Sequence, residues 1–373
     1  MIKIDYENKE NIEDIYRLWQ DTFKDSEGFA EYYFKEKCKE NRILTLGEDG
    51  KVLSMLHLNP YNISLSENLM EAFYIVGVAT DKNYRRKGYM RIVLEKALRD
   101  MAAEGRPFTF LMPESTSYYT PFNFSRLYET VAIEYDSWDN NEKDNKDKEI
   151  KLINIQDIHS SEYIQSIGRV MEGFYNMYAI RDAGYFSSLL KESKGEGGDV
   201  VFFKKDSKLI GYFSYYISGG KARINQLISD FSVEEAIELV REYLYSYSTN
   251  FILPKYLVHK EGMDLEKALS KKEDKGIMFR SLRPDKLLTL LRSQEKRELM
   301  IKIVDPIILE NNKVYLWKIG PKYSELIECK EENQIVLTIE DVNNLVFGEG
   351  SLEGMKVYWK NGHNKRILIN EVV

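Results

Sequence analysis

The 373 residues, of which 43% are apolar and 30% charged, have the composition of an ordinary globular protein and suffice for two or three domains. The formal net charge of −7 argues against a general nucleic-acid-binding protein and fits a cationic small-molecule substrate. No apolar run approaches the length of a membrane span, and residues 1–5 lack the layout of a signal peptide, so we expect a cytoplasmic protein.

Metal and hydrolase chemistry find no support in the sequence. The four histidines are isolated and form no His-Glu-x-x-His pattern, so no metal site is predicted. The two cysteines, Cys38 and Cys329, lie far apart and are predicted to be free thiols. A Gly-x-Ser-x-Gly motif, which would indicate a serine hydrolase, does not occur.

The beginning of the chain predicts two helices followed by strands. Asn11 is the expected N-cap of a helix with one apolar face over residues 12–23, and a second helix is expected over residues 29–38. Strands are expected at 43–46 and 52–58, on either side of a Glu-Asp-Gly turn.

The segment from 78 to 91 is the most informative part of the chain. An apolar strand over 73–78 leads into a basic loop with Gly88, and an amphipathic helix pattern follows over 90–101. A helix start presents free backbone N–H groups to an anion, and glycine lets the backbone approach that anion closely. The spacing matches neither a P-loop nor a dinucleotide-binding fingerprint, and we predict a pyrophosphate-binding loop. Four cations supply the countercharge: Arg85, Arg86, Lys87 and Arg91.

An aromatic segment downstream of this loop contains two adjacent tyrosines. The next strand is expected over residues 107–112, and this aromatic segment follows it at 117–124. A phenol is a competent acid near neutral pH, so Tyr119 in this segment is a candidate proton donor. Most of the 26 tyrosines must simply pack, so a purely structural role is the alternative for Tyr119 and for its neighbour Tyr118.

The middle of the chain repeats this layout without the basic loop. A highly charged linker at 136–149 precedes a helix over 163–174. The expected strands are 200–203, 211–217 and 222–227. Ser232 opens a further helix with a Ser-x-x-Glu capping box. The loop before it has neither cation nor glycine, and Asp230 would repel a phosphate, so this part is not expected to bind one.

The C-terminal part has a different pattern, that of a separate α+β module. It begins at the apolar segment 276–282, and a short helix is expected at 340–347. The expected strands are 300–304, 314–318, 335–339 and 355–359.

These features together resemble a known family. Residues 85–90 resemble the Arg/Gln-x-x-Gly-x-Gly/Ala loop with which the GNAT superfamily of N-acetyltransferases holds acetyl-CoA, although Met90 replaces the usual small residue. The segment from Tyr119 resembles the Tyr-x-x-Phe-x-Phe/Tyr segment that lies beside the thioester in that superfamily. The arrangement of the whole chain resembles the enhanced-intracellular-survival (Eis) acetyltransferases.

The resemblance implies a mixed α+β fold with tandem GNAT-like domains and a C-terminal sterol-carrier-protein-like α+β domain. The expected boundaries are 1–135 for the catalytic domain, 150–275 for a second GNAT-like domain without the CoA loop, and 276–373 for the C-terminal domain. A homo-oligomer is also implied, because the family assembles into hexamers.

The activity implied by the resemblance is direct transfer of an acetyl group from acetyl-CoA, without a metal, to a primary amine. The acceptors would be cationic small molecules such as aminoglycosides, polyamines or lysine. Tyr119 would be the general acid, and the α-carboxylate of Val373 the general base. Two alternatives remain: transfer to protein or peptide lysines, and a non-catalytic protein that binds acyl-CoA or lipid.

The resemblance also implies individual contacts. Asp25, Phe23 and Glu371 would contact the acceptor. The implied acetyl-CoA contacts are Val78, Ala79, Thr80, Arg86, Lys87, Gly88, Tyr89, Met90, Arg91, Glu114 and Ser115.

Overall fold

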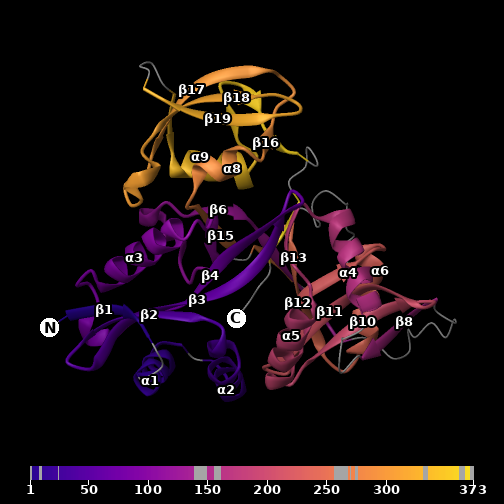
Figure 1. Cartoon of the computed structure of the whole chain (residues 1–373). Coiled ribbons are helices and arrows are strands. Elements are labelled where there is room, and N and C mark those ends of the chain that lie inside the picture. The colour runs from indigo at the N-terminus through magenta and orange to yellow at the C-terminus, as the bar shows by residue number, and fades with distance from the viewer. Residues whose placement is uncertain are drawn as a thin grey trace.

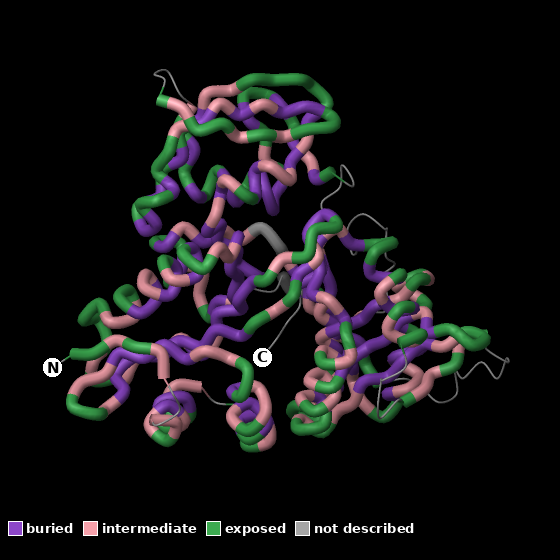
Figure 2. Tube along the Cα trace, viewed as in Figure 1, coloured by how far each residue is buried: buried purple, intermediate pink, exposed green. Residues whose placement is uncertain are grey.

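The computed structural model describes residues 2–7, 11–23, 25–137, 149–154, 161–255, 268, 270–273, 276–330, 335–360 and 366–369. These residues form three units, each built on a β-sheet (Figure 1). The first unit is drawn in indigo and purple, the second in pink and the third in orange and yellow. Buried residues follow the strands and the inner faces of the helices in all three units (Figure 2).

The first unit is a mixed nine-stranded sheet. The strands are β1 (Ile2–Tyr6), β2 (Arg42–Glu48), β3 (Lys51–Leu65), β4 (Asn68–Thr80), β5 (Phe108–Leu111), β6 (Ser125–Tyr128), β9 (Met177–Ala179), β15 (Ile277–Ser281) and β24 (Ile367–Leu368). The main path runs β1-β2-β3-β4-β5-β15-β6, while β9 pairs with the last residues of β3 and β24 pairs with β9.

Helices cover both faces of this sheet. They are α1 (Ile12–Thr22), α2 (Glu27–Lys35) and α3 (Tyr89–Ala103). Successive residues of a strand point to opposite faces, so each face has its own core. Ile43 and Met55 pack with apolar residues of α1 and α2, whereas Leu44 and Leu56 belong to the core that contains the buried face of α3.

The helices and strands expected in this unit are present, but several of their ends differ. The strands expected at 52–58 and 73–78 are longer, at Lys51–Leu65 and Asn68–Thr80. Asn11 precedes α1 as expected, but its side chain does not cap the helix and donates to Glu7 at 2.9 Å instead. The helix expected over 29–38 ends at Lys35, and a 3₁₀ turn at Lys37–Lys39 follows it. Its side-chain cap is Ser26, which accepts from the Phe29 N–H.

The second unit is a seven-stranded sheet in the order β14-β7-β13-β12-β11-β10-β8. These strands are β7 (Thr130–Tyr135), β8 (Ile150–Asn154), β10 (Asp199–Lys205), β11 (Lys208–Ser218), β12 (Lys221–Ser229), β13 (Ser248–Pro254) and β14 (Ser270–Glu273). Its helices are α4 (Ser161–Phe174), α5 (Ala183–Gly195) and α6 (Val233–Tyr243). Ser232 caps α6 as expected, by accepting from the Glu235 N–H at 3.1 Å. α4 and α5 pack on one face and α6 on the other.

The third unit has a four-stranded sheet in the order β19-β18-β17-β20 over two helices. Its elements are α8 (Pro284–Leu288), β16 (Leu291–Arg292), β17 (Arg297–Val304), β18 (Val314–Ile319), β19 (Ser324–Cys329), β20 (Ile335–Thr338), α9 (Ile339–Phe347), β21 (Ser351–Leu352), β22 (Met355–Lys356) and β23 (Tyr358–Trp359). The single strand expected at 355–359 is two short strands, because β22 pairs with β21 whereas β23 pairs with β16. Among the helices of the described residues, none is long and apolar enough to cross a membrane.

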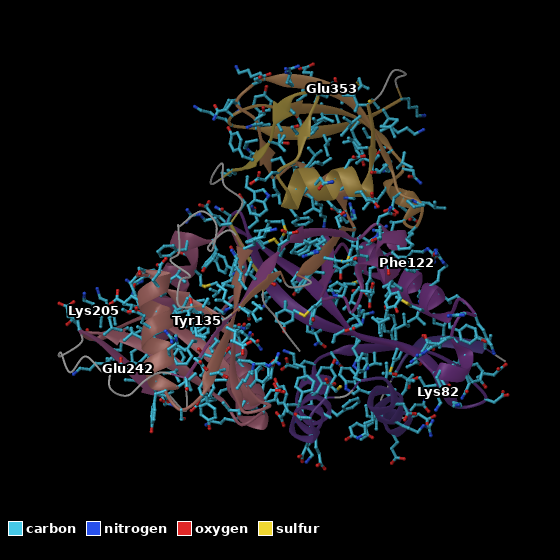
Figure 3. All side chains as sticks on the ribbon, turned by 180° about the vertical axis from the view of Figure 1, so that it is seen from behind. Lys82, Phe122, Tyr135, Lys205, Glu242 and Glu353 are labelled. Atoms are coloured by element: carbon cyan, nitrogen blue, oxygen red, sulfur yellow. The ribbon has the colours of Figure 1, made fainter. Side chains whose placement is uncertain are left out.

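Strands cross between the units. β7, within the range expected for the first domain, pairs with β13 and β14 of the second sheet, and Figure 3 labels its Tyr135 there. β15, expected to begin the C-terminal domain, lies between β5 and β6 of the first sheet. β9 and β24 extend the first sheet with strands from later in the chain. The three units are therefore joined by shared backbone pairing.

A β-bulge interrupts β4 at Gly77. His57 lies opposite Val76 and Met55 opposite Ala79, so β4 has one residue more than β3 at this point. Gly77 has φ of +62°, and a Cβ there would collide with the Trp19 ring. Both the backbone angle and the packing therefore require glycine.

We expect Gly77→Ala to lower the melting temperature more than Gly50→Ala. Gly50 also has a positive φ, of +82°, but a Cβ there meets no atom. The left-handed conformation costs each variant about 1 kcal/mol. The collision with Trp19 should add about 1–3 kcal/mol for Gly77→Ala alone. Equal melting temperatures for the two variants would contradict this account.

Candidate active site

A cavity opens where β4 and β5 separate. The two strands are parallel and pair only at Phe73 with Thr109 and at Tyr74 with Phe110. The Thr109 hydroxyl donates to the Phe73 carbonyl at 2.7 Å and holds this last point of contact. β4 then continues to Thr80 while β5 ends, and a cavity of about 1180 Å³ lies there.

Most of the predicted site residues line this cavity. Those that line it are Phe23, Asp25, Val78, Ala79, Thr80, Arg86, Gly88, Tyr89, Met90, Arg91, Glu114 and Tyr119. Lys87 and Ser115 do not. The Lys87 ammonium lies over the Tyr84 ring, 4.5 Å from its centre, and the Ser115 hydroxyl lies 2.8 Å from that of Ser117.

The basic loop forms a corner of the cavity whose geometry suits an anion. Gly88 is the N-cap of α3 with φ of +83°, and Arg86 also has a positive φ, of 63°. Backbone in such turns directs successive N–H groups to one side, and the first N–H groups of a helix have no partner within it. A Cβ on Gly88 would meet no protein atom, so the space beside it is open for a ligand. Arg85 braces the loop by donating to the Thr80 carbonyl at 3.1 Å.

Tyr118 and Tyr119 both line the cavity, but only Tyr119 is buried. Tyr119 is 8% exposed, against 57% for Tyr118, and the Tyr119 ring packs edge-on against Phe124. Burial, with a smaller contribution from Tyr118, raises the pKa of the Tyr119 phenol to about 12. The phenol therefore keeps its proton at neutral pH, as a general acid must.

Acidic and aromatic side chains form another wall. The Trp19 indole donates to the Asp25 carboxylate at 2.9 Å, and the Trp19 and Phe23 rings lie 4.8 Å apart. Asp25 as a whole is exposed, but its carboxyl group is partly buried. This burial raises the pKa of the carboxyl, and the hydrogen bond from Trp19 opposes that rise. Burial and the Asp25 charge also raise the pKa of Glu196, which follows α5. Two carboxyls from different units thus share this region.

An aromatic cluster separates the large cavity from a second one. Tyr74 lines the large cavity and packs against Phe110 and Tyr61, with ring centres 5.3 and 6.4 Å away. Tyr61 lines a second cavity, of about 350 Å³, between the first sheet and α5. Burial raises the pKa of Tyr74, and Tyr61, Tyr119 and Glu192 of α5 raise it further. Tyr119 and the α5 wall are therefore near neighbours across Tyr74.

The two predicted residues of the chain end, Glu371 and Val373, lie outside the described residues. The residues that sequence analysis missed are those supplied by tertiary contact. In the sequence, Trp19 is part of the apolar face of a predicted helix and Tyr74 is part of a predicted strand, while no pattern indicates α5 with Glu192. The continuous apolar run in β4 is the local signal that Tyr74 is buried.

Comparison with known proteins identifies the unit that carries the cavity. Residues 3–127 match the model of the acetyltransferase (GNAT) domain family. No curated protein matches the sequence. The chain is similar to a GCN5-related N-acetyltransferase from Anabaena variabilis, with a TM-score of 0.74 at 14% identity, covering 100% of this chain and 98% of that one.

Two further solved structures are similar over most of the chain. A conserved protein of unknown function and probable N-acyltransferase from Enterococcus faecalis has a TM-score of 0.74 at 16% identity, covering 91% of this chain and 88% of that one. Eis1 from Mycobacterium abscessus has a TM-score of 0.63 at 11% identity, covering 94% and 90%. At these identities the likeness shows the fold, a mixed α+β architecture.

Residues 3–127 are thus an acetyltransferase domain of the GNAT type, and the chain is an acetyltransferase. Acetyltransferases of this type use acetyl-CoA. The residues present fit its pyrophosphate, because the corner at Gly88 combines free N–H groups, cations and open space.

We expect Gly88→Val to weaken acetyl-CoA binding by about tenfold or more, because a side chain there blocks the approach of a phosphate to the backbone. The matched control is Gly220→Val, since Gly220 has a similar φ of +76° and a Cβ there also meets no atom, but it lies in the second unit. Titration calorimetry of the unsubstituted chain should give one site per chain, and equal affinities for the two variants would contradict the assignment.

Proposed function

We propose that the chain is an acetyl-CoA-dependent N-acetyltransferase for primary amines of cationic small molecules, with Tyr119 as general acid. One observation carries the proposal. A buried, protonated phenol lines the same cavity as the anion-binding start of α3. A thioester held by its pyrophosphate at Gly88 and extended along β4 would bring its sulfur into this cavity.

The residues of the site would divide the reaction between them. Bound acetyl-CoA supplies a thioester carbonyl, whose carbon–sulfur bond breaks as the bond to the amine nitrogen forms. The β4 bulge at Gly77 leaves a backbone N–H outside the strand ladder, which suits stabilisation of a developing oxyanion. Tyr119 would donate its proton to the departing thiolate.

Negative charge around the cavity supports a cationic acceptor. Burial raises the pKa of both Asp25 and Glu196, and the Asp25 charge raises that of Glu196 further, so a bound ammonium near them would offset this cost. Glu192 of α5 lines the second cavity, and its charge contributes to the raised pKa of Tyr74. We propose that the acceptor approaches from the side of the second cavity, while Phe23 packs against its apolar parts.

The proposed base is the α-carboxylate of Val373, with Glu371 adding negative charge beside the acceptor. The direction of β24 supports this assignment. β24 runs parallel to β9. Directly after β9, the Ile180 N–H donates to the Asn62 carbonyl of β3 at 2.8 Å. The direction of β24 therefore leads along β3 towards Tyr61. Ile369, which directly follows β24, is fully buried.

We propose further that the chain is an Eis-type enzyme, that its second unit is a GNAT-like domain and that its third unit is a sterol-carrier-protein-like domain. In the second unit, Asp230 follows β12 where the first unit has its cations, so only the first unit would bind CoA. We also propose that the chain assembles as a homo-oligomer.

We expect Tyr119→Phe to lower kcat by about 10²–10⁴-fold with little change in the Kd of acetyl-CoA, because the phenol acts mainly in the transition state. Exposed Tyr118→Phe is the matched control and should keep its turnover. The measurement is thiol release from acetyl-CoA with a polyamine, an aminoglycoside and a lysine peptide as acceptors. Wild-type turnover in Tyr119→Phe would refute the assignment, and activity with the peptide alone would favour a protein substrate.

The raised pKa of Tyr119 predicts how turnover behaves in alkali. An ordinary phenol, with a pKa of about 10, would lose half of its acid form at pH 10. Because burial raises the pKa of Tyr119 to about 12, its proton is retained well above pH 10 and lost only as the pH approaches that value. We therefore expect no fall in kcat centred near pH 10. Such a fall, absent from Tyr119→Phe, would contradict the prediction.

A peptide tag added after Val373 should abolish transfer, since it converts the proposed base into a neutral amide and moves the charge. Acetyl-CoA affinity and melting temperature should stay close to those of the untagged chain, and the same tag before Met1 should be harmless. Full turnover by the C-terminally tagged chain would rule out the α-carboxylate as base.

A further inference from the structure

Residues more than a hundred positions later in the chain donate hydrogen bonds to the turn that follows Tyr119. Arg280 of β15 is fully buried, and its guanidinium donates three hydrogen bonds. Nε donates to the Phe122 carbonyl, Nη1 to the Ser281 carbonyl and Nη2 to Asp305 Oδ1, each at 2.8 Å.

Asp305 fixes the position of this guanidinium. Its carboxylate is also fully buried and accepts from the backbone N–H groups of Ile307 and Ile308 at 2.9 and 3.0 Å. The Asn311 amide donates to its other oxygen at 2.9 Å. A buried ion pair is a weak source of stability, because both charges lose their hydration. The geometry that it imposes is a better account of why it is present.

Asn343 of α9 holds the next carbonyl of the same turn. Its amide donates to the Asn123 carbonyl and to the Ser125 hydroxyl, each at 2.9 Å, and accepts from the Ser281 N–H at 2.8 Å. Asn123 has a positive φ of 61°, a left-handed conformation that asparagine adopts more readily than most residues. Two consecutive carbonyls are thus fixed by β15 and by the third unit.

The turn transmits this restraint to Tyr119 and to the cavity. The Phe122 N–H donates to the Tyr119 carbonyl at 2.9 Å, and the Phe124 N–H donates to the same oxygen at 3.4 Å. The Phe122 ring lines the acetyl-CoA cavity, and the Arg91 guanidinium lies over it, 4.9 Å from its centre. Figure 3 labels Phe122 beside α3, below the third unit.

We propose that Arg280 and Asn343 are positioning residues through which β15 and the third unit aim the Tyr119 phenol at the reacting sulfur. This inference rests on the proposed role of Tyr119 as general acid. A misplacement of about 1 Å at a reacting group can cost up to a hundredfold in rate, so the restraint has a catalytic use beyond folding.

The test compares variants that release the turn with one that does not. Asn343→Leu keeps the branching of the side chain and removes the hydrogen bonds of its amide, including the one to the Asn123 carbonyl. Arg280→Lys keeps the charge beside Asp305 and loses the fork that also reaches Phe122. Ser324→Ala is the matched control, because Ser324 bonds Trp317 and the Leu288 carbonyl within the third unit and does not touch the turn.

We expect Asn343→Leu and Arg280→Lys to lower kcat by roughly tenfold to a hundredfold, with the Kd of acetyl-CoA changed less than about threefold. Ser324→Ala should keep its turnover. The kcat values are measured well below each melting temperature. If one of the two variants fails to fold, the other still provides the comparison.

Repeating Asn343→Leu in the Tyr119→Phe background separates positioning from general destabilisation. If Asn343 acts through the phenol, its loss should lower kcat no further there. An equal loss in both backgrounds, or a loss of melting temperature without a loss of kcat, would overturn the inference. Wild-type turnover of the single variant Tyr119→Phe would refute both the proposed function and this inference. If Tyr119→Phe is inactive and Asn343→Leu keeps its turnover, only this inference is refuted.

Discussion

The separation of two parallel strands after two paired residues is the constraint on which the site depends. Backbone groups that would otherwise pair β4 with β5 face a cavity instead, and the bulge at Gly77 turns the end of β4 towards it. The same separation gives the start of α3 an opening into which its N–H groups can point. Acidic and aromatic side chains then only need to line a space that the backbone has already created.

Features set by short stretches of sequence could be predicted, whereas contacts between segments far apart in the chain could not. The loop around Gly88, the face of α3 and the place of Tyr119 follow from spacing within short windows, because glycine conformation and helical periodicity are local properties. Even there, Lys87 turns to Tyr84 instead of the cavity. The insertion of β15 beside β5 and the wall formed by α5 depend on contacts over long sequence separations, which no local pattern encodes.

The second and third units contribute to the site in different ways. The second unit supplies α5, with Glu192 and Glu196, as a wall facing the first sheet, although its own helix α6 begins after an acidic loop. The third unit contributes no residue to the lining of the large cavity among the described residues, and its contact is with the backbone behind Tyr119. One unit thus forms a wall beside the proposed acceptor site, and the other contacts the backbone that follows the proposed general acid.

The placement of β15 and β24 in the first sheet has a consequence for how the protein is made. A ribosome delivers the chain from its N-terminus, so β5 emerges with one edge uncovered and waits for residues 277–281 before that edge is paired. The strand β9 likewise waits for residues 367–368. Nascent chains therefore carry open strand edges until residues 367–368 have emerged. Translation that stops before them yields a sheet with unpaired, aggregation-prone edges that quality-control chaperones and proteases would have to remove.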